Sequence, residues 1–175
     1  MPDLARRLFL LRHAHSSHPD GIPDMHRPLS VRGEHEAAEM GAYLENEGLV
    51  PDLVVVSGAQ RTRETWRAVQ TQLSVQVPFL IENRLYEAGI QTLLSVLAQQ
   101  PASCHKLMLV GHNPGMQTLA QRLVGRGSQN AVVRLRHEFP PAGLAVVAFS
   151  DVSDWADLPD HAGMLERFAT PATGA

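Results

Sequence analysis

Two adjacent residues near the start of the chain combine a cation with a nucleophile. Arg12 and His13 follow the short apolar run Leu8–Leu11. A charged side chain directly after a buried strand is costly unless it meets an anion. The charge of Arg12 favours the neutral form of His13, and a neutral imidazole can attack phosphorus and carry the phosphoryl group covalently. An isolated Arg-His pair is more often structural, so this interpretation depends on what accompanies it.

Two further segments carry residues suited to binding phosphate. Arg61 lies near the start of an expected helix over residues 59–73. Helix N-termini attract anions, and the guanidinium adds a fork of donors that matches phosphate oxygens. His112 lies between Gly111 and Gly115 in a turn where the backbone can approach a ligand closely. It is therefore a candidate donor to a phosphoryl oxygen, most effective as charge develops in the transition state.

The elements that must position these residues alternate between apolar runs and helical patterns. The runs predict strands at residues 8–11, 53–56, 75–80, 107–110 and 144–149, and helices are expected at 30–48, 59–73, 91–99 and 116–124. This alternation predicts an α/β fold, a three-layer α/β/α sandwich around a mostly parallel sheet. In such a sheet ligands bind beyond the carboxyl ends of the strands. Arg12-His13, Ser57 with Arg61, and His112 should therefore share one edge.

Length and composition narrow the class of protein. The 175 residues, 44% of them hydrophobic, predict a single domain with its core over about residues 8–168 and a flexible tail at 170–175. The net charge of -3 gives no broad footprint for nucleic acid or an anionic membrane. The run Leu8–Leu11 is too short for a signal peptide, and no apolar stretch is long enough to span a membrane. We expect a cytoplasmic protein.

Taken together, these segments resemble a known family. The run Leu10-Leu11-Arg12-His13 with Ser16, the segment 57–65 and the turn 111–115 occur in the order typical of the histidine phosphatase superfamily, which has the phosphoglycerate mutase-like fold. The chain is most similar to the short SixA-like branch, named for a phosphohistidine phosphatase. The branch-level features are Arg27-Pro28-Leu29-Ser30 with Arg32-Gly33, Leu85-Tyr86-Glu87-Ala88, and Gly143-Leu144-Ala145. The resemblance extends over residues 8–168.

The resemblance implies a role for each matching residue. His13 would be the nucleophile that becomes phosphorylated. Arg12, Arg61 and His112 would complete the phosphate pocket, and Ser16 would orient the loop or touch phosphate. The expected substrate is a phosphohistidine protein or a small phosphate ester, with no cofactor and no metal. One departure is Gly58, where the family usually has proline, and we expect it to have little effect on the chemistry.

The general acid is the least defined part of the site. Larger members of the family supply a Glu or Asp from an inserted segment, but the chain between Arg61 and His112 has no room for a large lid. Glu87 is the candidate, with Asp20 and Asp24 in the first loop as alternatives. A short lid also implies an open site, suited to a phosphoryl group carried on a protein.

Two other functions fit parts of the pattern. The His13-x-His15 spacing, with His18 nearby, could chelate zinc in a metal-dependent hydrolase. Arg12 would repel that cation, so we expect His15, His18 and His26 to be loop residues. The second alternative is a non-catalytic phosphate or phosphoprotein binder on the same scaffold. His13 argues against it, because a binder needs arginines more than an unprotonated imidazole.

Overall fold

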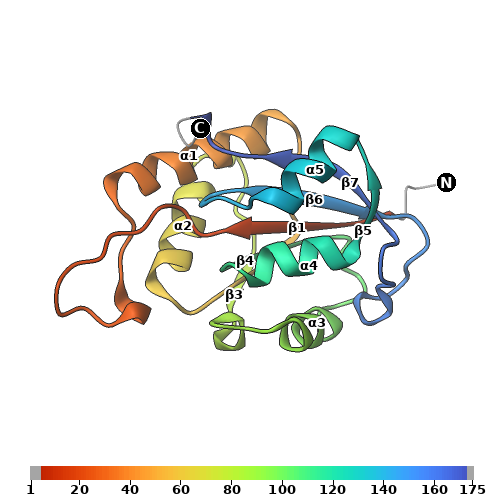
Figure 1. Ribbon diagram of the computed structural model, residues 1–175, viewed down its shortest axis with the longest axis horizontal. Helices are drawn as coiled ribbons and strands as arrows, with labels where there is room; N and C mark the ends of the chain where they lie inside the picture. Colours follow the sequence, from red (N-terminus) through yellow and green to blue (C-terminus); the bar gives the residue numbers. More distant parts are fainter. Residues whose placement is uncertain (1–4, 173–175) are drawn as a thin grey trace.

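The computed structural model describes residues 5–172, which build one sheet of seven strands (Figure 1). The order across the sheet is β3-β2-β4-β1-β6-β7-β5. Within the described residues β6 runs against its neighbours, and all the other pairings are parallel. The strands are β1 (Arg6–Arg12), β2 (Leu53–Val56), β3 (Phe79–Ile81), β4 (Lys106–Gly111), β5 (Val124–Gly127), β6 (Leu144–Phe149) and β7 (Gly163–Ala169).

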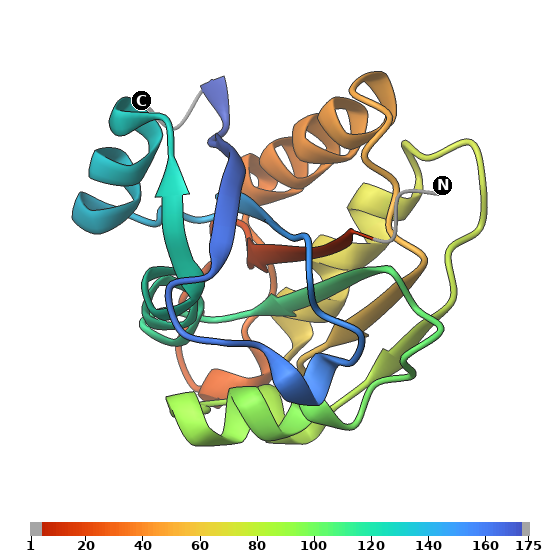
Figure 2. The same cartoon turned by 90° about the vertical axis from the view of Figure 1, so that its right-hand side faces the viewer.

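Helices cover both faces of this sheet, as expected for a three-layer sandwich (Figure 2). Apolar residues of α1 and α2 pack on one face, and those of α3, α4 and α5 pack on the other. The helices are α1 (Val31–Asn46), α2 (Gln60–Gln70), α3 (Ile90–Ala98), α4 (Gly115–Leu123) and α5 (Gln129–His137), with 3-10 turns at Asp24–His26, Asn83–Leu85 and Trp155–Asp157. Between residues 5 and 172 no helix combines the length and the apolar character needed to cross a bilayer.

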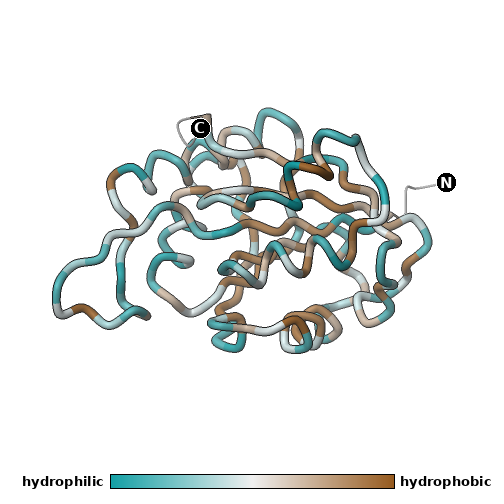
Figure 3. The backbone as a smooth tube through the Cα atoms, viewed as in Figure 1, coloured by the Kyte–Doolittle hydropathy of each residue, from teal (hydrophilic) through white to brown (hydrophobic). Residues whose placement is uncertain are grey.

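The central strand β1 shows why the core has two halves. Leu8 and Leu10 pack into the layer of α3 and α4, whereas Phe9 and Leu11 pack into the layer of α1 and α2. Side chains alternate across a strand, so a strand covered on both faces must be apolar at every position. In Figure 3 much of the backbone of the central strands is brown (hydrophobic), and many of the outer loops are teal (hydrophilic).

Parallel pairing brings the polar residues after three strands to one edge. Both β1 and β2 pair with β4, and Arg12 lies opposite Gly111 at the end of the ladder. The residues that follow the three strands are His13, Ser57 and His112. The shared edge predicted from the sequence is therefore confirmed. The loop between β1 and α1 extends beyond it, at the left of Figure 1.

The sequence patterns placed some elements wrongly and missed others. The expected strand at 75–80 is wrong, because pairing with β2 begins only where Val54 N–H donates to the carbonyl of Pro78, and the strand is Phe79–Ile81. The sequence did not predict the strands β5 and β7 or the helix α5. β5 contains two glycines and no apolar run, so its sequence does not indicate a strand. Ser128 caps α5, its hydroxyl accepting a hydrogen bond from Ala131 N–H at 3.2 Å, and this serine was a usable signal for the start of the helix.

The last described residues, Pro171 and Ala172, lie against the rest of the protein. Within the tail expected to be flexible, Pro171 is buried and Ala172 N–H donates to Glu39 Oε1 at 2.8 Å. This contact shortens the segment expected to be flexible. Residues 173–175 lie outside the described residues.

The start of α1 packs tightly against the loop that carries His13. Ser30 caps this helix, its hydroxyl accepting from Gly33 N–H at 3.0 Å, and Ser30 N–H donates to the His15 carbonyl at 3.0 Å. A Cβ atom at Gly33 would lie 1.9 Å from the His15 carbonyl oxygen. Only glycine therefore allows the helix to approach the loop this closely.

We expect Gly33→Ala to destabilise the protein although alanine favours helices. Relief of the clash requires movement of the helix or of the loop, at a cost of about 1–3 kcal/mol in the free energy of unfolding, reduced by the gain in helix propensity. Urea unfolding measures the change. His35→Ala, at an exposed position of the same helix, serves as the control with a change within about 0.5 kcal/mol. Equal stability of Gly33→Ala and wild type would contradict the close approach.

Candidate active site

His13 is held at the sheet edge by the backbone and by its own ring. His13 N–H donates to the Gly111 carbonyl at 3.0 Å, and Ala142 N–H donates to the His13 carbonyl at 3.0 Å. The ring Nδ1 lies 2.7 Å from the Ala14 carbonyl. A carbonyl oxygen can only accept, so Nδ1 carries the proton. In the neutral ring Nε2 then has a free lone pair.

The surroundings of His13 keep the ring neutral. Burial lowers its pKa to about 3, against the opposing effect of the hydrogen bond to Ala14. Electrostatic interactions with His112, Arg12 and Arg61 lower this pKa further. At neutral pH the side chain therefore has an unprotonated, nucleophilic ring nitrogen, as predicted from the neighbouring Arg12.

Two guanidinium groups flank this ring. Arg12, at the end of β1, donates from Nη1 to the Phe139 carbonyl at 2.8 Å. Its pKa is lowered, first by burial and then by the charge of Arg61. Arg61 is only 7% exposed, lies in the first turn of α2, and donates to the Asp24 carbonyl at 2.8 Å and to Asp24 Oδ2 at 3.1 Å. Two arginines that lower the pKa of neighbouring groups define a locally positive site.

His112 lies beside His13, and its ring is held by a hydrogen bond with Ser57. The two ring centroids are 5.4 Å apart, and His112 Nε2 lies 2.8 Å from Ser57 Oγ. Burial, followed by the charge of Arg61, lowers the pKa of His112 to about 4, although Asp24 opposes this shift. A neutral His112 that accepts from the Ser57 hydroxyl carries its proton on Nδ1. It can then donate to an oxygen in the site.

Three buried nitrogens around the site have no hydrogen-bond partner within the described residues: Arg12 Nε, Arg61 Nε and His112 Nδ1. Buried polar atoms are nearly always paired, and an unpaired one costs about 1–3 kcal/mol. All three belong to side chains that the sequence assigned to a phosphate pocket. All three side chains interact electrostatically with His13, so an oxyanion bound beside His13 would lie near them.

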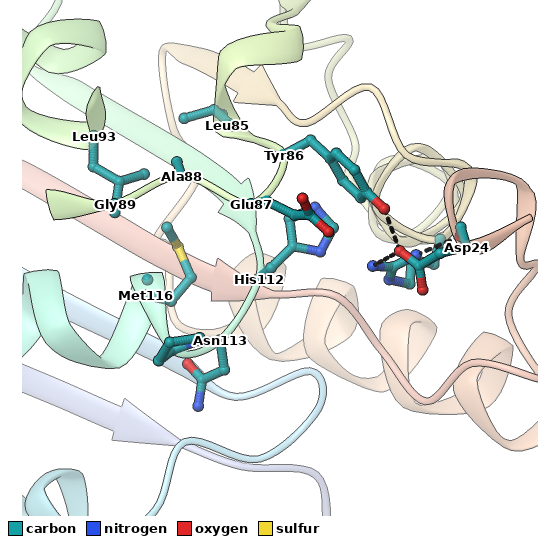
Figure 4. A pocket seen from close by; sticks show the side chains of 13 residues that line it. Asp24, Leu85, Tyr86, Glu87, Ala88, Gly89, Leu93, His112, Asn113 and Met116 are labelled. Atoms are coloured by element: carbon teal, nitrogen blue, oxygen red, sulfur yellow. Dashed lines mark hydrogen bonds and ion pairs between the residues drawn. The ribbon is translucent and has the colours of Figure 1, made fainter. Parts of the chain in front are cut away.

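The loop between β1 and α1 brings Asp24 into the site, where its carboxyl group is ionised. Tyr86 Oη donates to Asp24 Oδ2 (Figure 4). Arg27 Nη1 donates to Asp24 Oδ1 at 2.7 Å. The hydrogen bond from Tyr86 first, and then those from Arg27 and Arg61, hold the pKa of Asp24 well below its usual range. Asp24 therefore carries no proton to donate near neutral pH. Its ionised state argues against the alternative role of general acid, and in the structure Asp24 is a partner of Arg61.

The other candidate acids differ in their positions. Glu87 lies with Tyr86 and His112 in the wall of a cavity of about 460 Å³ next to the site (Figure 4). Its φ of 54° is in the left-handed region, which non-glycine residues rarely adopt. Asp20 lies in an exposed turn and does not line this cavity. Glu87 thus stays a prediction for the acid, and Asp20 has no support.

Ser16 and the loop histidines have local partners. Ser16 is buried and accepts from Arg27 Nη2, so it lies among residues of the first loop. Its contact with phosphate stays a prediction. His15 Nδ1 lies 2.7 Å from Ser30 Oγ, and His18 Nε2 lies 3.1 Å from Arg27 Nη2. His26 is exposed. Over residues 5–172 no three side chains of the metal-binding types gather as a candidate metal site.

Two residues of the site were not assigned a role from the sequence. Ser57 touches His112, and Tyr86 connects Asp24 with the aromatic edge of His112, 5.5 Å between ring centroids. Ser57 follows β2 directly, and this position was the available signal. Next to it, a Cβ atom at Gly58 would lie 1.9 Å from Asn83 Oδ1. Glycine at this position therefore makes room for the Asn83 side chain.

Comparisons with known proteins agree with this site. Residues 8–93 match the family model of the histidine phosphatase superfamily (branch 1). A solved structure of a proposed phosphohistidine phosphatase SixA from Agrobacterium tumefaciens is 30% identical, covers 95% of this chain and 99% of its own, and superposes with a TM-score of 0.78. A second, from Nakamurella multipartitia, is 29% identical, covers 96% of this chain and 97% of its own, and has a TM-score of 0.82. The uncharacterized protein Rv1276c of Mycobacterium tuberculosis is 32% identical over 92% of this chain and 99% of its own length.

The chain belongs to the histidine phosphatase superfamily. Its fold is that of the phosphoglycerate mutase-like members, and within the superfamily it is SixA-like. The class of enzyme that this family and site define is a phosphatase, as the sequence predicted.

The lowered pKa of His13 makes stability depend on pH. Between pH 6.5, the ordinary value, and about 3 the unfolded chain binds a proton that the folded protein does not. The free energy of unfolding therefore falls as pH falls through this window. We expect His13→Gln to flatten the slope by up to about 1.4 kcal/mol per pH unit near pH 5.

Urea unfolding from pH 7 to pH 4 measures this slope. His137→Gln, at an exposed position of α5, is the matched control and should keep the wild-type slope. An unchanged slope in His13→Gln would show that His13 is protonated as readily in the folded protein as in the unfolded chain.

Proposed function

We propose that this phosphatase hydrolyses its substrate through a covalent phosphohistidine on His13, with no metal ion. The observation that carries the proposal is the buried, neutral ring whose Nδ1 is bound to the Ala14 carbonyl, which leaves Nε2 as the nucleophile. The unpaired nitrogens of Arg12, Arg61 and His112 support a phosphoryl group beside it. The resemblance of the chain to the SixA-like branch favours the same roles.

The proposed reaction has two displacements at phosphorus. First the Nε2 lone pair of His13 forms a bond to phosphorus, and the bond to the leaving group breaks with its electron pair. Arg12, Arg61 and His112 bind the equatorial oxygens and stabilise their charge. Then water attacks phosphorus, the phosphorus–nitrogen bond breaks, and its electron pair returns to Nε2. The proton of the water goes to solvent.

The proposed substrate class is a phosphohistidine protein, with a small phosphate ester as the second candidate. Asp24 is ionised and bound to Arg61, so it supplies no proton to a leaving group. An imidazole leaving group needs less help than an alkoxide, because protonation of its second ring nitrogen by solvent lets it depart as neutral imidazole. The names of the two solved relatives support the same class. Glu87 would assist departure if an ester is the substrate.

His13→Ala should abolish turnover while the fold persists. We expect a loss of about 10³-fold or more in the hydrolysis of p-nitrophenyl phosphate, since the nucleophile is removed. His18→Ala, in the same loop but exposed, is the control and should retain activity. Circular dichroism of both variants checks the fold.

The same assay separates the proposal from its alternatives. Activity of the wild type should survive EDTA, and strict dependence on added zinc would favour the metal-dependent hydrolase. Saturable phosphate binding with no release of phosphate from any ester or phosphohistidine peptide would favour the non-catalytic binder.

Ser57 is a positioning residue in this scheme, because it acts through His112. We expect Ser57→Ala to lower kcat about 10-fold, with a smaller change in KM, since His112 loses the partner that orients its proton toward the transition state. Ser57→Thr, which keeps the hydroxyl, should recover much of this loss. A kcat unchanged in Ser57→Ala would contradict the role of the contact.

A further inference from the structure

A second cavity lies between α2 and the edge strand β3, outside the site described above. Its volume is about 460 Å³, and one wall is formed by Arg63, Trp66 and Arg67, which are spaced along one side of α2. Phe79 and Ile81 of β3 form the other wall. We call this cavity the α2–β3 groove.

The strand beside the groove has a free hydrogen-bonding edge. Val54 N–H donates to the carbonyl of Pro78, and Glu82 N–H donates to the carbonyl of Val56. Backbone groups of alternate residues point to opposite sides of a strand, so those of Phe79 and Ile81 point away from β2. β3 is the last strand on this side of the sheet. An exposed edge of this kind is a template for another strand.

The side chains of the groove are apolar, neutral polar (Gln70, Thr71 and Gln76) and positively charged. Phe79 is 55% exposed, an unusual position for a large aromatic residue of a strand. Arg63 and Arg67 are exposed and have no acidic partner among residues 5–172, and no acidic side chain lines the groove. Trp66 is buried, and its indole N–H lacks an acceptor within the same part of the chain.

We propose that the α2–β3 groove binds an extended acidic segment of a partner protein, which adds to β3 as a further strand. The backbone of the segment pairs with Phe79 and Ile81, its apolar side chains cover the exposed ring, and its carboxylates meet Arg63 and Arg67. The charge argues against a second copy of this chain, because two such grooves would bring four arginines together.

The groove lies close to the catalytic residues. Val56 lines it, and the next residue, Ser57, holds His112. A partner bound along β3 is therefore positioned beside the phosphate pocket. The use of the groove to present a phosphohistidine depends on the proposed function, whereas the docking itself does not.

Binding to the full chain tests the docking. The probe is a fluorescein-labelled peptide in which a short run of valine and threonine is flanked on both sides by glutamates, measured by fluorescence anisotropy. We expect saturable binding, weakened about tenfold or more when lysines replace the glutamates and when alternate backbone nitrogens are methylated. The double variant R63E/R67E should lose binding to a similar degree. R126E/R136E, which reverses two exposed arginines elsewhere, should bind as the wild type does.

Equal affinity for the acidic and basic peptides, or no saturable binding of either, would overturn the proposal. It would also be overturned by sedimentation velocity that shows a wild-type dimer dissociated by R63E/R67E, because a second copy would then occupy the groove.

A turnover measurement separates this proposal from the proposed function. The acidic peptide is extended by a phosphohistidine, and we expect R63E/R67E to raise its KM about tenfold with kcat unchanged and with p-nitrophenyl phosphate hydrolysis intact. If the peptide binds but is not dephosphorylated, the phosphohistidine substrate class fails and the docking stands. If R63E/R67E hydrolyses the acidic peptide with the wild-type KM, the docking fails and the proposed function stands.

Discussion

The contact between His13 Nδ1 and the Ala14 carbonyl determines what this site can do. The carbonyl accepts the only proton of a neutral ring, and burial beside two guanidinium groups makes a second proton unfavourable. The nucleophile is thus ready without a base to activate it. Three features of the fold position His13. β1 ends at Arg12, and the Gly111 carbonyl accepts a hydrogen bond from His13 N–H. Gly33 lets α1 pack closely against the loop that follows.

The site without substrate is electrostatically incomplete. Arg12, Arg61 and His112 each keep a buried nitrogen with no partner in the described part of the chain, which costs stability. Within residues 5–172, Arg61 alone of these three has an anionic partner, Asp24 of the first loop, which also accepts a hydrogen bond from Tyr86. The protein as a whole is acidic, with a net charge of -3, so the positive pocket is a local feature of three strand ends rather than of composition.

The sequence predicted the parts of this site that follow from local pattern. Apolar runs followed at once by Arg12-His13 and by His112 identified strand ends, and parallel pairing then required these residues to meet. It could not show that Ser57 touches His112 or that Tyr86 touches Asp24, because these contacts join residues far apart in the chain. The lowered pKa of Asp24 was equally unpredictable, because it depends on hydrogen bonds from the distant residues Tyr86 and Arg61. The strands β5 and β7 were not predicted because they lack continuous apolar runs. They are defined by pairing, β5 with β7 and β7 with β6.

The most direct test of the account is the isolation of the phosphorylated intermediate. The protein is mixed with a rapidly reacting phosphoramidate, quenched in alkali, digested and analysed by mass spectrometry. A covalent phosphohistidine mechanism predicts one phosphoryl group on the peptide that contains His13, stable to alkali, lost in acid, and absent from His13→Ala. Turnover of the same substrate with no phosphorylated peptide, or with the phosphoryl group on another histidine, would contradict it.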